Sequence, residues 1–226
     1  MTGSFDFSPL WLSLLLAAVT TFVLLIVATP LAWWLASTRS RIKVVIEAIT
    51  ALPLVLPPTV LGFYLLILMS PTAPIGNFWR TLTGSTLAFS FTGLVLASVI
   101  YSLPFAVQPL QTAFEAVGRG PVEAAATLGA SPFDAFVTVV SPLALRGYIT
   151  AAVLSFAHTI GEFGVVLMVG GSIPGRTKVI SIAIYEHVET IDYASAHVLS
   201  GAMLLLSFCS LMLVFIANRR FPVRIG

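Results

Sequence analysis

Long apolar runs alternate with short polar segments along the chain. Charged residues are absent from four stretches: 10–36, 48–79, 81–114 and 198–218. A helix that crosses a bilayer needs ~20 mainly apolar residues. The pattern therefore predicts five membrane spans within a single membrane domain over residues 1–226, at about 10–36, 45–70, 87–113, 142–168 and 197–217.

Composition supports an all-α protein of the cell membrane. Of the 226 residues, 58% are hydrophobic and 9% are charged, whereas soluble domains carry roughly a quarter charged residues. The apolar run 10–36 is longer than the ~7–15-residue core of a cleaved signal peptide, and no basic segment precedes it. We therefore expect this run to remain as the first span.

Basic residues predict how the spans are oriented. With the N-terminus outside, eight Lys and Arg residues face the cytoplasm and three face outside, which is the bias of the positive-inside rule. The cytoplasmic set is Arg39, Arg41, Lys43, Arg119, Arg146, Arg219, Arg220 and Arg224, and the external set is Arg80, Arg176 and Lys178. The chain is therefore predicted to be N-out and C-in. Its net charge of +2 reflects this bias and does not indicate nucleic-acid binding.

Two loops are long enough to carry function. One is cytoplasmic and covers 115–141. The other is external, covers 171–196, and contains an amphipathic segment at 179–188. Near the cytoplasmic start of the second span, Glu47 is expected to pair with the basic cluster that ends at Lys43.

The cytoplasmic loop contains signals for short helices. Pro121 suits the first position of a helix, and Gly129 suits a left-handed cap at its end. Ser131 and Asp134 form a capping-box pattern, and Ser141 is expected to begin the fourth span. These signals predict a helix of about eight residues, a glycine turn and a second short helix. Because so short a helix is unstable alone, it either docks on a partner or lies on the bilayer surface.

The same loop resembles the EAA loop of ABC importer permeases. The family pattern is Glu-Ala-Ala, three residues, Gly, nine residues and then Ile-x-Leu-Pro; this chain has Val139 and Ser141 in place of the Ile and the Leu. In that family the loop forms a coupling helix that sits in a groove of a separate ATPase subunit. The resemblance assigns ATPase coupling to Glu123, Ala124, Ala125, Leu128, Gly129 and Ser131, and it implies the five-span bundle of a type I ABC importer.

Two further segments resemble oxyanion permeases. ALPLVLPPTVLGFYLL is similar to their second-span signature, and IGEFGVVLMVGGSIPGRTKVISIAIY is similar to the corresponding end of molybdate permeases. Sulfate permeases share GEFG but usually lack the IPG-x-T run, here 173–177. The resemblance therefore implies import of molybdate, with tungstate as a second substrate candidate and sulfate or thiosulfate as the alternative function.

The resemblance also implies the partners. These are a second copy of the chain, two cytoplasmic ABC ATPase subunits that carry the ATP and Mg, and an extracytoplasmic oxyanion-binding protein. Arg176 and Lys178 in the external loop are candidate contacts for that binding protein, or else ordinary solvated residues. The chain itself is expected to hold no cofactor.

Four residues are candidates for the transport pathway or its gate. Pro57 and Pro58 interrupt the second span, either where it lines a pathway or tight helix contact or where it re-enters at the membrane interface. His158 and Glu162 are spaced i, i+4, so they are expected to share a helix face. An ionisable pair inside a membrane is a candidate gate, and the alternative is a buried pair that fixes helix register. Relatives often carry Arg where this chain has His158.

Enzymatic function is not expected. The chain has no G-x-x-x-x-G-K-[ST] phosphate loop, so ATP hydrolysis must be on another subunit. It also lacks H-E-x-x-H and Cys/His metal spacings, so no metal site is expected. A channel or a secondary transporter is the remaining rival class, but a channel has no use for a docking helix, and a secondary transporter would typically have two related halves.

Overall fold

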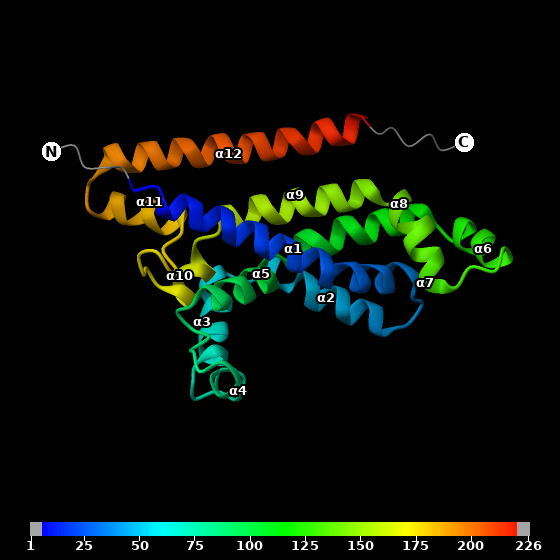
Figure 1. Ribbon diagram of the computed structural model, residues 1–226, viewed down its shortest axis with the longest axis horizontal. Coiled ribbons are helices and arrows are strands. Elements are labelled where there is room, and N and C mark those ends of the chain that lie inside the picture. The colour runs from blue at the N-terminus through cyan, green and yellow to red at the C-terminus, as the bar shows by residue number, and fades with distance from the viewer. Residues whose placement is uncertain (1–5, 221–226) are drawn as a thin grey trace.

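The computed structural model describes residues 6–220, and within this range all of the regular secondary structure is helical and there is no strand. Figure 1 shows the helices in chain order. Their bounds are α1 (Ser8–Ser37), α2 (Ile42–Val55), α3 (Pro58–Met69), α4 (Pro74–Thr83), α5 (Phe91–Val117), α6 (Gly120–Thr127), α7 (Pro132–Ala135), a π-helix η1 (Phe136–Val140), α8 (Ser141–Leu143), α9 (Leu145–Gly161), α10 (Gly164–Gly170), α11 (Ile180–Glu189) and α12 (Tyr193–Arg220).

Three described helices are long and apolar enough to cross a membrane, and the number rises to five if each of two bent pairs forms one span. The three are α1, α5 and the first 21 residues of α12. The bent pairs are α2 with α3 and the segment Pro132–Leu143 with α9. The upper count of five equals the number of spans predicted from the sequence, and two of these five would be bent.

The core of the molecule is formed where α1, α5 and α9 pack together. Leu24 and Leu35 of α1, Leu110 and Phe114 of α5 and Ala151 of α9 are buried in one cluster. Small residues let these helices approach closely, as they do in membrane bundles generally. α12 packs against α9 and α11 but leaves most of its large apolar side chains exposed.

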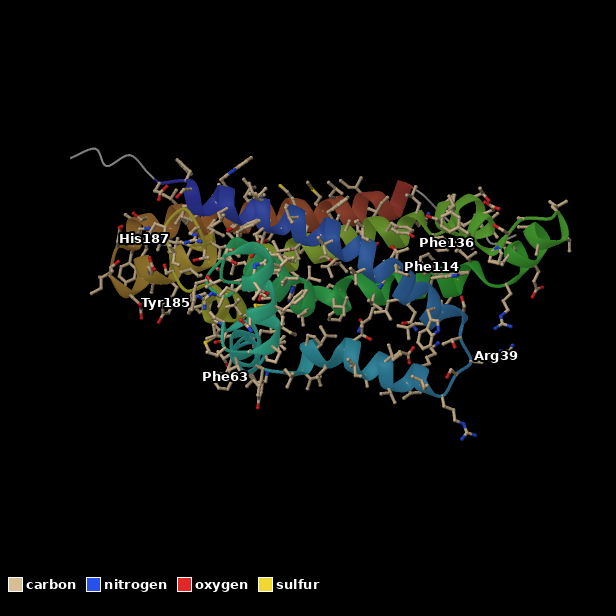
Figure 2. All side chains as sticks on the ribbon, turned by 60° about the horizontal axis from the view of Figure 1, so that its bottom comes forward. Arg39, Phe63, Phe114, Phe136, Tyr185 and His187 are labelled. Carbon is tan, nitrogen blue, oxygen red and sulfur yellow. The ribbon has the colours of Figure 1, made fainter. Side chains whose placement is uncertain are left out.

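Segments that were predicted to share a side of the membrane lie at the same end of the bundle. α6 and the C-terminal end of α12 lie at one end, and α10, α11 and the start of α1 lie at the other (Figure 1). Arg39 lies at the α6 end, opposite Tyr185 and His187 (Figure 2). Arg224 lies outside the described residues. The N-out, C-in orientation stays a prediction.

Two predicted spans differ in shape from the expectation. The span 45–70 is broken between α2 and α3, whose axes differ by 111°, because Pro57 and Pro58 interrupt the helical hydrogen-bond pattern. The span 142–168 does not begin at Ser141, because that residue continues the helix from α7 through η1 into α8. A 71° bend at Ala144 follows, and α9 then ends at Gly161.

Replacing Gly147 with Ala is expected to lower the stability of the chain. The added methyl group would lie 2.3 Å from Cβ of Ala113 and 3.1 Å from the carbonyl oxygen of Pro109, so α5 and α9 would have to separate. Overpacking costs typically about 1–3 kcal/mol, which exceeds the ~1 kcal/mol that Ala gains over Gly inside a helix. Thermal unfolding of the purified chain in detergent measures the change.

Gly201→Ala is the matched control, because Gly201 is a helical glycine of α12 with no atom within 4 Å of an added Cβ. Its unfolding temperature should stay the same or rise slightly. Equal unfolding temperatures for wild type and Gly147→Ala would contradict the close approach of α5 and α9.

Candidate functional site

The cytoplasmic loop folds as its capping signals predict. α6 has eight residues, with Pro in its first turn and no buried side chain. Gly129 has a φ of 87°, and its N–H donates to the carbonyl of Ala126 at 3.0 Å. Ser131 caps the next helix by accepting from the N–H of Asp134 at 3.2 Å. The predicted helix, glycine turn and capped second helix are therefore confirmed.

The tip of this loop is apolar and exposed. Leu128 is 89% exposed and Phe133 is 74% exposed, while Glu123 and Ala124 also face solvent. The loop therefore presents an exposed surface, formed by α6, Leu128 and Phe133, that no other described part of the chain covers.

An aromatic cluster joins this loop to the core helices. The ring of Phe136 in η1 lies 5.4 Å from that of Trp33 in α1 and 5.8 Å from that of Phe114 in α5. Phe114 in turn meets Tyr148 of α9 at 5.9 Å. Phe114 and Phe136 lie together at the α6 end of the bundle in Figure 2. The loop is therefore connected through aromatic contacts to three core helices, α1, α5 and α9.

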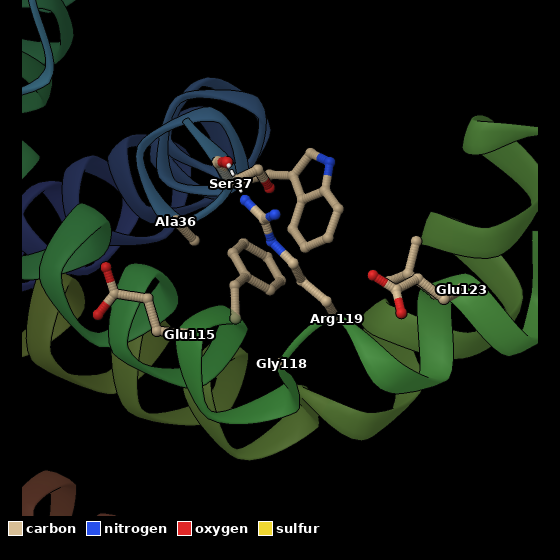
Figure 3. A pocket seen from close by; sticks show the side chains of 9 residues that line it. Ala36, Ser37, Glu115, Gly118, Arg119 and Glu123 are labelled. Atoms are coloured by element: carbon tan, nitrogen blue, oxygen red, sulfur yellow. Dashed lines mark hydrogen bonds between the residues drawn. The ribbon is translucent and has the colours of Figure 1, made fainter. Parts of the chain in front are cut away.

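A pocket of about 470 Å³ lies between the ends of α1 and α5 and the start of α6. Arg119 projects into it and donates to the carbonyl oxygen of Ser37 at 3.4 Å (Figure 3). Glu115 and Glu123 lie on either side of it (Figure 3). Arg119 therefore ties the segment just before α6 to the end of α1.

A polar network next to this pocket joins α2 to α5. Lys43 lies 3.6 Å from Glu47 and 3.3 Å from Glu115, and Gln111 donates to both carboxylates at 2.7 and 3.0 Å. The predicted pairing of Glu47 with the basic cluster is confirmed through Lys43. Sequence reasoning missed Gln111, although its i, i+4 spacing to Glu115 places both on one face of α5.

The pathway candidates gather at a second cavity, of about 580 Å³, at the C-terminal end of α9. It is lined by Pro58 and Thr59 of α3, Tyr101 of α5, His158 of α9 and Glu162 after α9, among others. Pro57 forms the start of α3, beside the lining residue Pro58. The structure thus brings the proline break and the two ionisable residues to one place.

His158 and Glu162 both line this cavity, as expected of residues spaced i, i+4. Glu162 is the C-cap of α9, with a φ of −70°, and the chain leaves the helix after it through an extended ψ of 134°. The two side chains do not pair with each other: His158 places Nδ1 2.9 Å from the hydroxyl of Ser102 and stacks on Phe105 at 4.0 Å. Ser102 was missed, although Ser98 and Ser102 mark a polar face on an otherwise apolar span.

The external loop is built around a tight turn and α11. α11 confirms the predicted amphipathic segment. Arg176 is exposed, whereas Lys178 forms an ion pair with Glu186, which also accepts from Ser172. Burial alone would raise the pKa of the Glu186 carboxyl, but the hydrogen bonds from Lys178 and Ser172 outweigh it and hold this pKa below its ordinary value. Of the two candidate contacts, Arg176 is therefore the more available.

Comparison with proteins of known sequence gives closely related permeases. The "Molybdenum transport system permease protein ModB" of Azotobacter vinelandii is 59% identical over 216 residues, which cover 96% of this chain and 95% of the relative. The protein of the same name from Escherichia coli (strain K12) is 36% identical over 80% of this chain and 81% of its own. The "Sulfate transport system permease protein CysT" of Synechocystis sp. is 32% identical over 84% of this chain and 66% of its own.

Solved structures share the fold. A bacterial alginate ABC transporter in complex with an alginate pentasaccharide-bound periplasmic protein contains a chain that matches with a TM-score of 0.71 at 15% identity, over 96% of this chain and 78% of that one. The MetNI methionine ABC transporter in inward-facing conformations contains a chain that matches with a TM-score of 0.66 at 18% identity. The match covers 92% of this chain and 94% of that one. The fold is therefore that of type I ABC importer permeases, as predicted.

The sequence model of one family covers most of the chain. The family is described as "Binding-protein-dependent transport system inner membrane component", and its model matches residues 28–222. This match supports a multi-pass membrane location and a transport role rather than an enzymatic one, as the sequence predicted. The chain belongs to this family of inner-membrane permeases of binding-protein-dependent transport systems.

Proposed function

We propose that the chain is the permease subunit of an ATP-driven importer that moves molybdate into the cytoplasm. The observation that carries this proposal is the exposed α6 loop, which we interpret as a docking device because the chain has no ATP-binding motif of its own. The substrate assignment rests on the 59% identity to a molybdenum permease over almost the whole of both chains. The sulfate permease is less similar and longer than this chain, so sulfate is the weaker candidate.

The ATPase subunit docks on α6. An eight-residue helix that buries no side chain in its own chain gains stability from a partner surface. Leu128 supplies an apolar anchor, and the small side chains of Ala124 and Ala125 allow a groove to close around the helix. Glu123, Gly129 and Ser131 fix the shape of the helix and its turn through the dipole, the left-handed cap and the N-cap.

Two copies of the chain enclose the pathway, because five spans surround too little space alone and two-fold pairing is the commonest assembly. Two ATPases then hold two α6 helices, and ATP-driven closure of the ATPases brings these helices together. The aromatic cluster of Trp33, Phe114 and Phe136 passes the movement to α1 and α5. Alternation between inward-open and outward-open bundles moves the anion.

An external binding protein delivers the oxyanion to the opposite end. No Lys or Arg lies in the middle of a predicted span, so the pathway itself holds a dianion weakly and selection rests outside it. Arg176 is exposed at the tip of its turn and is available to a negatively charged partner surface. Lys178 contributes indirectly to binding of this partner, because its ion pair with Glu186 of α11 fixes the conformation of the loop.

Truncation of Leu128 to Ala is expected to weaken binding of the ATPase. Loss of a central anchor costs at least about 2 kcal/mol, which corresponds to roughly 30-fold weaker binding. Gly129→Pro should also abolish coupling, because Pro cannot adopt the φ of 87° at this position. Co-purification of the ATPase and ATP hydrolysis in nanodiscs measure both effects.

The matched control is Leu205→Ala, which removes an equally large apolar side chain that is 62% exposed on α12. It should leave ATPase binding unchanged. Full ATPase binding by both Leu128→Ala and Gly129→Pro would show that the ATPase docks elsewhere.

Molybdate uptake tests the substrate. Proteoliposomes that contain the chain, its ATPase and its binding protein should accumulate radioactive molybdate only when ATP is enclosed with the ATPase. Excess tungstate should reduce the uptake of radioactive molybdate, whereas sulfate at the same concentration as the tungstate should reduce it little. Uptake of radioactive sulfate at the molybdate rate would favour the alternative function, and uptake without ATP would contradict the importer assignment.

A further inference from the structure

α4 is a short helix whose apolar side is not covered by the described part of the chain. It packs mainly against α3, and Ile75, Phe78 and Leu82 are spaced i, i+3 and i+7, so they share one side of the helix. Phe78 is 68% exposed, Leu82 is 69% exposed, and Ile75 is also exposed. Asn77 and Arg80 lie on the opposite side and face solvent. α4 is therefore amphipathic, with an uncovered apolar stripe formed by residues 75, 78 and 82.

The position of α4 on α3 is fixed by close packing. A Cβ added to Gly76 would clash with the carbonyl oxygens of Met69 and Ser70, so the glycine lets the backbone of α4 rest directly on the end of α3. Trp79 packs against the buried cluster that contains Leu65 and Met69. The direction in which the apolar stripe points is therefore determined by α3.

α3 and α4 form an arm that projects sideways from the bundle beside α10 (Figure 1). α2 packs along α5, and the 111° bend that follows α2 turns α3 across the bundle. α3 ends at Met69 and α4 begins at Pro74, and the four residues between them reach at most about 14 Å. Because α3 belongs to a predicted span, α4 must lie at or near the surface of the bilayer.

α3 also exposes large apolar side chains. Phe63, Tyr64 and Ile67 are exposed, and Phe63 lies at the edge of the arm, away from the long helices (Figure 2). Tyr and Trp are enriched where a protein crosses the membrane–water interface, and this arm carries Tyr64 and Trp79. The arm therefore has the residue types that are typical of an interfacial segment.

The apolar stripe fits a lipid surface better than a protein surface. A stable protein interface uses roughly 20–30 residues on each side, which is far more than this stripe offers. An amphipathic helix binds a bilayer by burying one apolar side at the headgroup boundary while its polar side stays in water. Arg80 is the charged residue of α4, and within the described residues it forms no ion pair, so it is available to lipid phosphates.

We propose that α4 is an interfacial helix that binds the lipid surface at this end of the bundle. Ile75, Phe78 and Leu82 enter the headgroup boundary, and Asn77 and Arg80 face water. Because α4 rests on the end of α3, its insertion sets the depth of α3 in the membrane.

The role of this anchor rests on the proposed function. Pro58 and Thr59 at the start of α3 line the second cavity, so α3 forms part of the wall of the expected pathway. Loss of the anchor frees α3 to shift and disturbs that wall.

Spin labels measure where each side of α4 lies. In the full-length chain Cys209→Ser removes the native cysteine, and Phe78→Cys, Leu82→Cys or Asn77→Cys then introduces a single labelling site. The labelled chain is studied with its ATPase in nanodiscs, through collisions with oxygen, which concentrates in lipid, and with a nickel chelate, which stays in water. We expect labels at 78 and 82 to be accessible to oxygen and protected from nickel, and the label at 77 to show the reverse.

Leu205→Cys is the matched control for a lipid-facing position, because Leu205 is 62% exposed on α12 within a predicted span. Its label should be accessible to oxygen and protected from nickel. The proposal is overturned if nickel reaches the labels at 78 and 82 as readily as the label at 77, which would place α4 in water. It is also overturned if neither reagent reaches 78 and 82, which would assign the stripe to a second copy of the chain or to another protein.

Molybdate uptake in proteoliposomes tests the role of the anchor. Phe78→Glu combined with Leu82→Glu should lose most of the uptake, whereas Asn77→Glu should keep it, and both variants should still bind the ATPase. Equal uptake by the two variants would overturn the role of α4 in holding the pathway wall. The label results do not depend on the substrate, so lipid-facing labels at 78 and 82 in a chain that transports no molybdate would overturn the substrate assignment and leave the interfacial helix intact.

Discussion

Satisfaction of backbone hydrogen bonds is the constraint on which the rest of this structure depends. A helix in hydrocarbon cannot end unless protein groups take up the freed N–H and C=O groups. At the end of α10 the hydroxyl of Thr177 donates to the carbonyl of Gly170 at 2.7 Å, and the N–H of Phe89 donates to that of Val169 at 2.9 Å. Because Thr177 belongs to the loop that follows α10 and Phe89 to the segment that precedes α5, ending α10 also fixes both of these segments.

Local signals were sufficient to predict the parts of the fold that local physics determines. The length of an apolar run gives a long helix such as α1, and caps give α6 and the glycine turn, because each depends on residues within a few positions. The same holds for Lys43 and Glu47, which are one helical turn apart. The local structure of the α6 loop was therefore predictable, whereas its role in docking stays a proposal.

The bends and the second cavity were not predictable, because they depend on contacts between distant segments. Pro57 and Pro58 predict a break, but its 111° angle depends on how closely α3 rests on α10. There an added Cβ on Gly62 would meet Met168 at 2.7 Å, and one on Gly164 would meet Pro58 at 2.6 Å. Similarly, the partner of His158 is Ser102, which is 56 residues away. No local pattern specifies that pairing.

The two ends of the bundle are built for different mechanical roles. At the α6 end, α6 buries no side chain, yet the segment after it is anchored by Phe136 against Trp33 and Phe114. A surface that covered α6 would therefore not have to displace a packed core, and the segment after α6 is in direct contact with α1 and α5. At the other end, Thr177 and Ser181 donate to the carbonyls of Gly170 and Glu162, so two hydrogen bonds hold the 171–196 loop to α10 and to the end of α9. The loop at this end is therefore packed onto the helices, whereas α6 at the opposite end buries no side chain.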